Sequence, residues 1–447
     1  MKPRIDSDFY QPDLFRSQLI QILNPDHPLI LLSDKIDWKR FETVLGDCFC
    51  SDNGAPALPI RLMIGLLYLK HAFNESDESL VQRWIENPYW QYFCGFNTLQ
   101  HELPLHPTSL VKWRQRVGAE RLAELLRETI DLAVKEKQIS PGELQQVNID
   151  TTVQEKNIAF PTDSNLLHKA IRMLVKAARG KGIRLRQTYA RVAKRTAIGV
   201  GRYAHAKQFR RMHRGIRKLK TWLGRLLREI WRNQPNPDQD LKRILELCAR
   251  LHKQQPKDSC KLYSLHECEV ACIGKGKAHK RYEFGQKVAL ATSNRGNWIV
   301  GIHLCPGNPY DGHTLTATLR NIESITGREV NSAYVDKGYR GHGYEGNAVI
   351  HIAGKSRGDL TGAERKRKKR RSAIEPKIGH MKSENRMGRC YLRGLAGDAM
   401  NAVLAAAGSN LRKLLRGLFF VFGLVRQEIV FVLLGKLGAQ PVVGFRA

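Results

Sequence analysis

The stretch QQVNIDTT, residues 145–152, marks the point where the spacing of apolar residues changes. Val147 and Ile149 fall on one face of an extended chain, and Asn148 and Asp150 fall on the other, which is the alternation of a half-buried β-strand. The chain before this stretch has apolar residues at helical spacing instead. The fold is therefore expected to change from helices to a sheet here, with a carboxylate at the end of the first strand.

Strand character returns further along the chain. FGQKVALATS (284–293) and WIVGIHLCP (298–306) flank a short polar turn and predict a β-hairpin. The other predicted elements are strands at 329–336 and 348–353 and helices at 311–325, from about Ser372, and at 398–416. This order of strands and helices predicts an α/β protein with a mixed sheet and flanking helices.

The composition divides the chain into four parts. We expect an N-terminal all-helical domain (1–140), a sheet domain (141–164 and 257–416), an all-helical basic insertion (165–256) and an apolar C-terminal tail (417–447). The tail's apolar runs are shorter than a bilayer span, which favours a buried helix pair or a dimer surface.

The net charge of +32 is concentrated in two places. Residues 169–232 contain 21 Lys and Arg and one acid, Glu229, and residues 365–371 are seven consecutive basic residues. Residues 1–140 are slightly acidic in contrast, with 16 Lys and Arg and 19 Asp and Glu. Such a field fits a polyanion, and nucleic acid is favoured over membrane because no basic amphipathic segment is paired with a lipid anchor.

Two other features leave alternatives open. Lys112, Arg114 and Arg116 open a long amphipathic segment, which could be a DNA-recognition helix or a solvated helix face. The nine scattered cysteines and the polar, acidic first residues predict a reduced, intracellular protein. The cluster Cys260, His266, Cys268 and Cys272 fits no familiar zinc spacing, so ordinary thiols are favoured there over a metal knot.

Two aspartates share a context. Asp150 and Asp336 each end a predicted strand, on the face opposite its apolar residues, and Gly338 and Gly341 follow the second of them. Two carboxylates at adjacent strand ends would repel each other unless a hard divalent cation such as Mg²⁺ or Mn²⁺ lay between them. The alternative for each residue alone is an ordinary turn or cap aspartate.

A third acid lies behind the basic run. Arg371, Glu375 and Lys382 are spaced so that all three fall on one helix face. Glu375 could hold a metal ion while the two flanking cations hold phosphate oxygens. Alternatively, Ser372 and Glu375 form a capping box at the start of that helix.

These acids resemble the Asp-Asp-Glu triad of bacterial insertion-sequence transposases with a ribonuclease-H-like core. The spacing of Arg371, Glu375 and Lys382 resembles their Tyr-Arg-Glu-Lys signature, although its Tyr position falls on Lys368. Tyr339 or Tyr344 could take the place of the tyrosine of that signature. YEFGQKVALAT, CPGNPYDGHTL, VDKGYRGHGY and SAIEPKIGHMKSENRMGRCYL are similar to the group named after insertion sequence five, and the resemblance covers most of 57–416.

The resemblance implies a transposase that cleaves DNA at the ends of an element and joins the 3′-hydroxyls to target DNA. It implies two Mg²⁺ or Mn²⁺ ions bound by Asp150, Asp336 and Glu375. The residues expected to contact DNA phosphates are Arg371, Lys382, Lys337, Arg340 and Lys368. It further implies double-stranded DNA partners (terminal inverted repeats and target), a homodimer, no membrane association, and a place in the bacterial cytoplasm at the nucleoid.

Two other functions stay open. A non-catalytic DNA-binding protein would explain the charge, and a structure-specific nuclease could use the same core. Asp311 and Glu283 are the runner-up acids, and Asp311 is expected to cap the helix that it opens.

Overall fold

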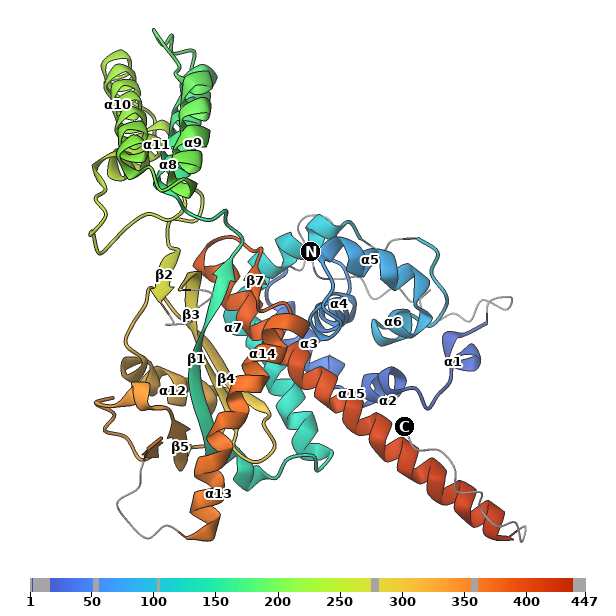
Figure 1. Ribbon diagram of the computed structural model, residues 1–447. Coiled ribbons are helices and arrows are strands. Elements are labelled where there is room, and N and C mark those ends of the chain that lie inside the picture. The colour runs from blue at the N-terminus through green and yellow to red at the C-terminus, as the bar shows by residue number, and fades with distance from the viewer. Residues whose placement is uncertain are drawn as a thin grey trace. The chain divides into compact units, whose positions relative to one another are not determined.

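The computed structural model describes Lys2 and residues 17–50, 56–102, 105–274, 281–354 and 361–436, with side chains as far as Leu418. The chain forms two compact units (Figure 1). The first consists of Met1–Glu155 and Gln286–Ala447, and the second of Lys156–Gly285. The second unit contains the predicted basic insertion, 165–256, and extends beyond it at both ends.

The helices of the first unit are α1 (Leu19–Ile22), α2 (Pro28–Lys35), α3 (Trp38–Gly46), α4 (Ile60–Ala72), α5 (Asp77–Glu86), α6 (Pro88–Phe93), α7 (Pro107–Lys135), α12 (Leu315–Thr326), α13 (Gly362–Arg370), α14 (Ile374–Glu384) and α15 (Gly394–Lys436). Short 3₁₀ turns are η2 (Pro141–Gln145), η3 (Asp311–Thr314), η4 (Lys337–Tyr339) and η5 (Arg371–Ala373). The second unit contains α8 (Asp163–Gly180), α9 (Ala190–His205), α10 (Phe209–Asn233) and α11 (Gln239–Lys253).

The strands are β1 (Gln146–Lys156), β2 (Ala271–Gly274), β3 (Tyr282–Ser293), β4 (Ile299–Cys305), β5 (Ser332–Val335), β6 (Val349–Ile352) and β7 (Arg389–Cys390). They form one sheet in the order β2-β3-β1-β5-β6, with β4 beside β3 and β7 beside β1. β3 and β4 are antiparallel, whereas β5 is parallel to both β1 and β6. The predicted hairpin and the predicted mixed sheet with helices are therefore confirmed.

The helices of 1–140 and the sheet share one hydrophobic core, which extends from Leu29 to Leu414. α15 packs against α7, α4 and β4, and α12 packs against β4. The buried Asn410 of α15 fixes this arrangement, because its side-chain oxygen accepts from the backbone N–H of Ile299 at 3.0 Å and its amide donates to the carbonyl of Ile299 at 2.9 Å. The amide thus satisfies both polar groups at the start of β4.

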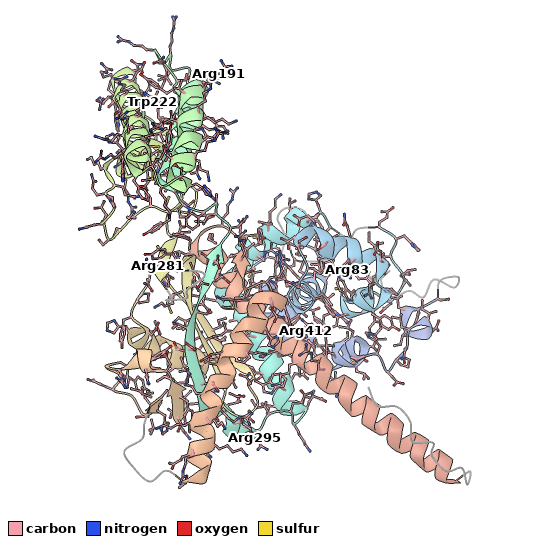
Figure 2. The ribbon with its side chains drawn as sticks, viewed as in Figure 1. Arg83, Arg191, Trp222, Arg281, Arg295 and Arg412 are labelled. Carbon is pink, nitrogen blue, oxygen red and sulfur yellow. The ribbon has the colours of Figure 1, made fainter. Side chains whose placement is uncertain are left out.

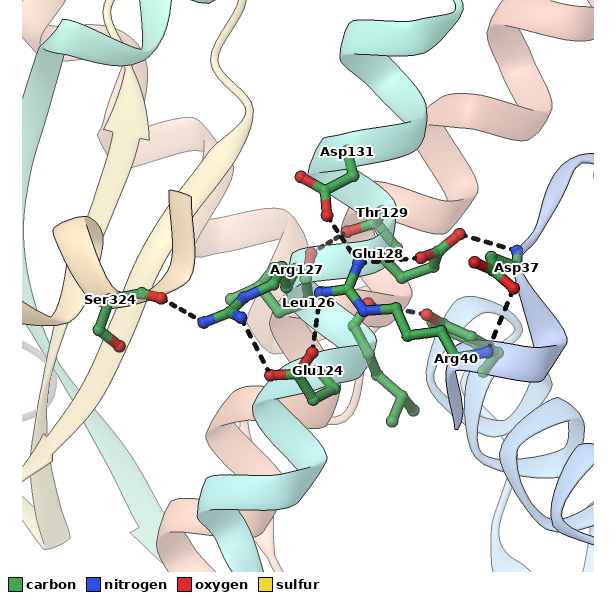
Figure 3. Close-up of polar contacts among 11 residues, drawn as sticks. Asp37, Arg40, Glu124, Leu126, Arg127, Glu128, Thr129, Asp131 and Ser324 are labelled. Carbon is green, nitrogen blue, oxygen red and sulfur yellow. Dashed lines mark hydrogen bonds and ion pairs between the residues drawn. The ribbon is translucent and has the colours of Figure 1, made fainter. Parts of the chain in front are cut away.

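Ion pairs join the N-terminal helices to α7 (Figure 3). Arg40 of α3 lies among three acids of α7, at 2.8 Å from Glu124, 3.4 Å from Glu128 and 2.7 Å from Asp131. Arg127, on the same helix, donates to the backbone carbonyl of Ser324 in α12. α7 therefore holds α3 on one side and α12 on the other.

The cations in the first turns of α7 do not all face solvent, because one of them is buried in an ion pair. Arg114 is only 1% exposed and forms a bidentate pair with Asp77, at 3.0 and 2.6 Å. Lys70 contacts the same carboxylate at 2.7 Å. Because its guanidinium is buried in this pair, Arg114 cannot read DNA, which removes the middle residue of the possible recognition helix.

The basic insertion of the second unit is all-helical, as predicted, and has a core of its own. Apolar residues of α8, α9, α10 and α11 form this cluster, which also includes Leu262. All nine cysteines of the chain are free thiols. Within the described residues, no group of three or more His, Cys, Asp or Glu side chains is arranged to hold a metal ion.

α15 continues as a helix into the predicted apolar tail and ends at Lys436. The side chains beyond Leu418 and residues 437–447 lie outside the described part. No described helix combines the length and the apolar character needed to cross a membrane. The assignment of the tail to a helix pair or a dimer surface stays a prediction.

Candidate active site

The sheet register places the segments around Asp150 and Asp336 in neighbouring strands. β1 and β5 are parallel, and their pairing extends to Asn148 with Tyr334. Asp336 directly follows β5, as predicted, whereas β1 continues to Lys156, so the expectation that Asp150 ends its strand was wrong. Adjacent strands are about 4.8 Å apart, so these two acids, 186 residues apart in the sequence, come from neighbouring segments of the sheet.

Asp336 is held by the turn that follows β5. Its Oδ1 accepts a hydrogen bond from the backbone N–H of Gly338 at 2.9 Å. A Cβ added to Gly338 would lie 3.0 Å from this oxygen and 3.3 Å from Oδ2 of Asp311, so the two carboxylate oxygens are at most about 6.3 Å apart, the sum of these distances. Gly338 therefore leaves the space between two acids open.

Asp311, which was expected to cap a helix, makes contacts with the sheet instead. It opens η3, but its side chain caps no backbone group there. Its Oδ1 instead accepts from the Thr151 hydroxyl at 2.8 Å and from the Lys287 ammonium at 2.9 Å. The expectation of a capping role was wrong, because the carboxylate turns toward β1 and β3. The run of polar residues in NPYDGHT would not have distinguished the two roles.

The pKa of the buried Tyr339 hydroxyl is affected by the same acids. Its side chain is 0% exposed. Burial, together with the negative charges of Asp150, Asp311 and Asp336, raises the pKa of Tyr339 far above its usual value. The hydroxyl therefore remains protonated.

The basic run is a helix attached to the sheet. α13 covers residues 362–370, begins with a capping box between Thr361 and Glu364, and has no buried residue. The amide of Asn148 donates to the carbonyl of Arg370 at 3.4 Å, and the amide of Asn294 donates to the carbonyl of Arg367 at 3.0 Å. The predicted helix start near Ser372 is confirmed to within two residues by α14, which begins at Ile374, whereas the separate helix over the basic run, with its capping signal at Thr361, was not predicted.

α14 follows α13 and η5, and it packs against α15. The Asn401 amide of α15 donates to Gln154 of β1 at 2.9 Å and to the carbonyl of Arg386, two residues beyond the end of α14, at 3.1 Å. The segment that carries Glu375 is thus tied to β1 before its start, through Asn148 and Arg370, and after its end, through Asn401.

The carboxylate of Glu375 does not, however, point into the aspartate cluster. Its Oε1 is 3.1 Å from the guanidinium of Arg371, and the side chain is 62% exposed. The predicted capping box is absent, since Ser372 donates instead to the carbonyl of Lys369 and α14 starts without a side-chain cap. The structure thus brings Asp336 and Asp311 close to each other across Gly338 and leaves Glu375 paired with Arg371, and within its described residues no three acids form a group that could hold a metal ion.

The predicted phosphate-binding residues are exposed or half-buried. Lys337 and Arg340 are exposed on the turn after Asp336, and Lys368 of α13, Arg371 of η5 and Lys382 of α14 are half-buried. Tyr310, which the sequence interpretation did not single out, donates from its hydroxyl to the carbonyl of Arg340 at 2.5 Å and so fixes the end of that turn.

Comparison with known proteins identifies two segments. Residues 17–116 match the family described as "Transposase domain (DUF772)", and residues 339–415 match the family described as "Transposase DDE domain". A Rhizobium meliloti protein, "Uncharacterized protein ORF8 in nfe locus", is 50% identical over 197 residues, which are 44% of this chain and 95% of that protein. No solved structure matches the chain. The second match includes Glu375 and begins three residues after Asp336.

Proposed function

The chain belongs to the DDE transposases of bacterial insertion sequences, and we propose that it cleaves phosphodiester bonds at the element's ends and joins the freed 3′-hydroxyls to target DNA. The observation that supports this proposal is the parallel pairing of β1 with β5 up to Asn148 and Tyr334, since a continued register would let Asp150 and Asp336 act together. The mixed sheet, with an antiparallel hairpin beside β1 and two parallel strands on its other side, supports a ribonuclease-H-like core.

Carboxylate oxygens are the ligands that hard divalent cations prefer, but no described group of three acids is arranged to hold one, so the proposed site requires the Glu375 side chain to turn toward the aspartates. Asp150 and Asp336 offer carboxylate oxygens at adjacent positions, and an uncompensated pair of this kind would be unfavourable. Asp150, Asp336 and Glu375 would hold two Mg²⁺ or Mn²⁺ ions, which supply an activated water and stabilise the leaving oxygen. Asp311 is partly neutralised by Lys287, and it would add negative charge behind the site.

The cations around the site position the DNA. Lys337, Arg340 and Lys368 can each bind a phosphate oxygen on the side where the backbone must approach Asp336. Arg371 would exchange its contact with Glu375 for one with phosphate, which frees the carboxylate to turn toward β1. Lys382, further along α14, would extend the same row. Joining two ends requires two active sites, so we propose a homodimer that works on chromosomal DNA at the nucleoid.

Cleavage of a plasmid that carries the element's flanking inverted repeats tests this function. We expect the full-length protein to cut at the repeat ends with Mg²⁺ and to produce no cuts with EDTA, because the carboxylates need the cation to approach phosphate. The measurement is the mapping of cut 3′ ends by sequencing gel.

Two outcomes would contradict a transposase. Equal cutting of a plasmid without the repeats would indicate a structure-specific nuclease. Binding to the repeats without any Mg²⁺-dependent cut would indicate a DNA-binding protein that has no catalytic role.

A further inference from the structure

The hairpin formed by α9 and α10 in the second unit ends in a segment without buried residues. The two helices touch most closely where Gly215 faces Val200, since a Cβ added to Gly215 would lie 2.5 Å from a Val200 methyl carbon. Buried residues on the near side of this contact are Ala193, Ala197, Leu219, Leu223 and Leu226. Beyond the contact, residues 201–214, here called the hairpin tip, contain no buried side chain.

All charged residues of the hairpin tip are basic. Its basic residues are Arg202, Lys207, Arg210, Arg211 and Arg214, and His205 and His213 lie among them. The sequence has no Asp or Glu between residues 164 and 228. The next acid, Glu229, accepts a hydrogen bond from the backbone N–H of Arg186 at 2.6 Å and so faces away from the tip. Five cations therefore lack an internal counter-charge.

Aromatic side chains accompany these cations. Phe209 is 55% exposed and Tyr203 is 36% exposed, and the guanidinium of Arg211 lies 6.0 Å from the Tyr203 ring. Figure 2 shows long side chains standing out from α9 and α10, with Arg191 at the start of α9 among them. A helical segment without a core is only marginally stable by itself, which favours a partner that covers it. Cations beside an exposed apolar ring fit duplex DNA, whose phosphates bind the cations and whose base steps accept the ring.

We propose that the hairpin tip is a second DNA-binding surface, which grips duplex phosphates with its cations and touches base steps with Phe209. This inference rests on the proposed function for the choice of DNA as the polyanion. It needs none of the catalytic acids, since binding through phosphates requires only cations. A tip-to-tip contact between two copies of the protein is disfavoured, because two such tips repel each other.

The test measures how the affinity for a fluorescein-labelled duplex of arbitrary sequence depends on salt, with the full-length protein in EDTA. The tip variant replaces Arg202, Arg210 and Arg214 by Gln, and the matched control replaces the exposed α11 and loop residues Lys242, Lys253 and Lys257 by Gln. If all three tip cations bind phosphates, the slope of log K against log salt should decrease by about 2.7 in the tip variant. The control should keep the wild-type slope.

The proposal would be overturned if the tip variant bound the duplex with the wild-type slope of log K against log salt. It would also be overturned if the slope changed for single-stranded DNA but not for the duplex. Phe209→Ala should weaken duplex binding several-fold at an unchanged slope, and unchanged affinity would contradict the contact with bases. The substituted side chains are exposed, so thermal unfolding should not change. A failed tip test together with normal Mg²⁺-dependent end cleavage would reject this inference alone, whereas a changed slope without any cleavage would reject the catalytic function alone.

Discussion

Replacing Asp336 by Asn is expected to leave DNA binding intact and to slow cleavage of the element's ends by about 10³-fold. Asn has nearly the same shape and can still accept from the Gly338 N–H, which Asp336 binds at 2.9 Å, so the turn after β5 should persist. It lacks the negative charge that a divalent cation needs. The measurement is single-turnover cleavage of a labelled end duplex, together with the Kd of the same duplex.

Asp150→Asn should give the same loss, because the register of β1 and β5 makes the two aspartates neighbours. The matched control is Asp240→Asn, an equal change of charge at an exposed residue in the first turn of α11, and its cleavage should be unaffected. Cleavage at the wild-type rate in either of the two site variants would remove that residue from the catalytic site.

Glu375→Gln is expected to reduce cleavage to a similar extent, for a different structural reason. In the absence of DNA the carboxylate is 62% exposed and paired with Arg371. Phosphate competes for a guanidinium through charge-assisted hydrogen bonds. We therefore expect DNA to occupy Arg371 and the released carboxylate to complete the metal site. Gln cannot supply the charge, so cleavage should fall by about 10³-fold while binding persists.

The matched control for this residue is Glu329→Gln, at an exposed position before β5, and it should cleave normally. If Glu375→Gln cleaves as well as this control, then Glu375 only pairs with Arg371, and Asp311 becomes the third acid by position. In that case Asp311→Asn should show the loss instead.

The sequence alone predicts the two strands that carry the aspartates, because alternation over 145–152 and 329–336 is a local signal. The prediction that the aspartate ends its strand is confirmed for Asp336, which follows β5, and is wrong for Asp150, because β1 continues to Lys156. Their adjacency depends on a parallel register between distant segments, which no local pattern specifies. The resemblance to a known triad supplied that step.

Asp311 and the basic run show where local reasoning fails. An Asp before a helix usually caps it, yet tertiary contacts with Thr151 and Lys287 direct Asp311 elsewhere. A run of seven cations is usually a solvated tail, yet amides of Asn148 and Asn294 bind its carbonyls and hold it as a helix. In both cases side chains from other strands, remote in sequence, decide the outcome.

The most direct test of a cation between Asp150 and Asp336 is a change of metal preference. In Asp336→Cys the carboxylate is replaced by a thiolate, a soft ligand that Mg²⁺ disfavours and Mn²⁺ tolerates better. End cleavage by this variant should be lost with Mg²⁺ and partly restored with Mn²⁺. Wild-type cleavage by Asp336→Cys with Mg²⁺ would show that this side chain touches no metal and would contradict the site.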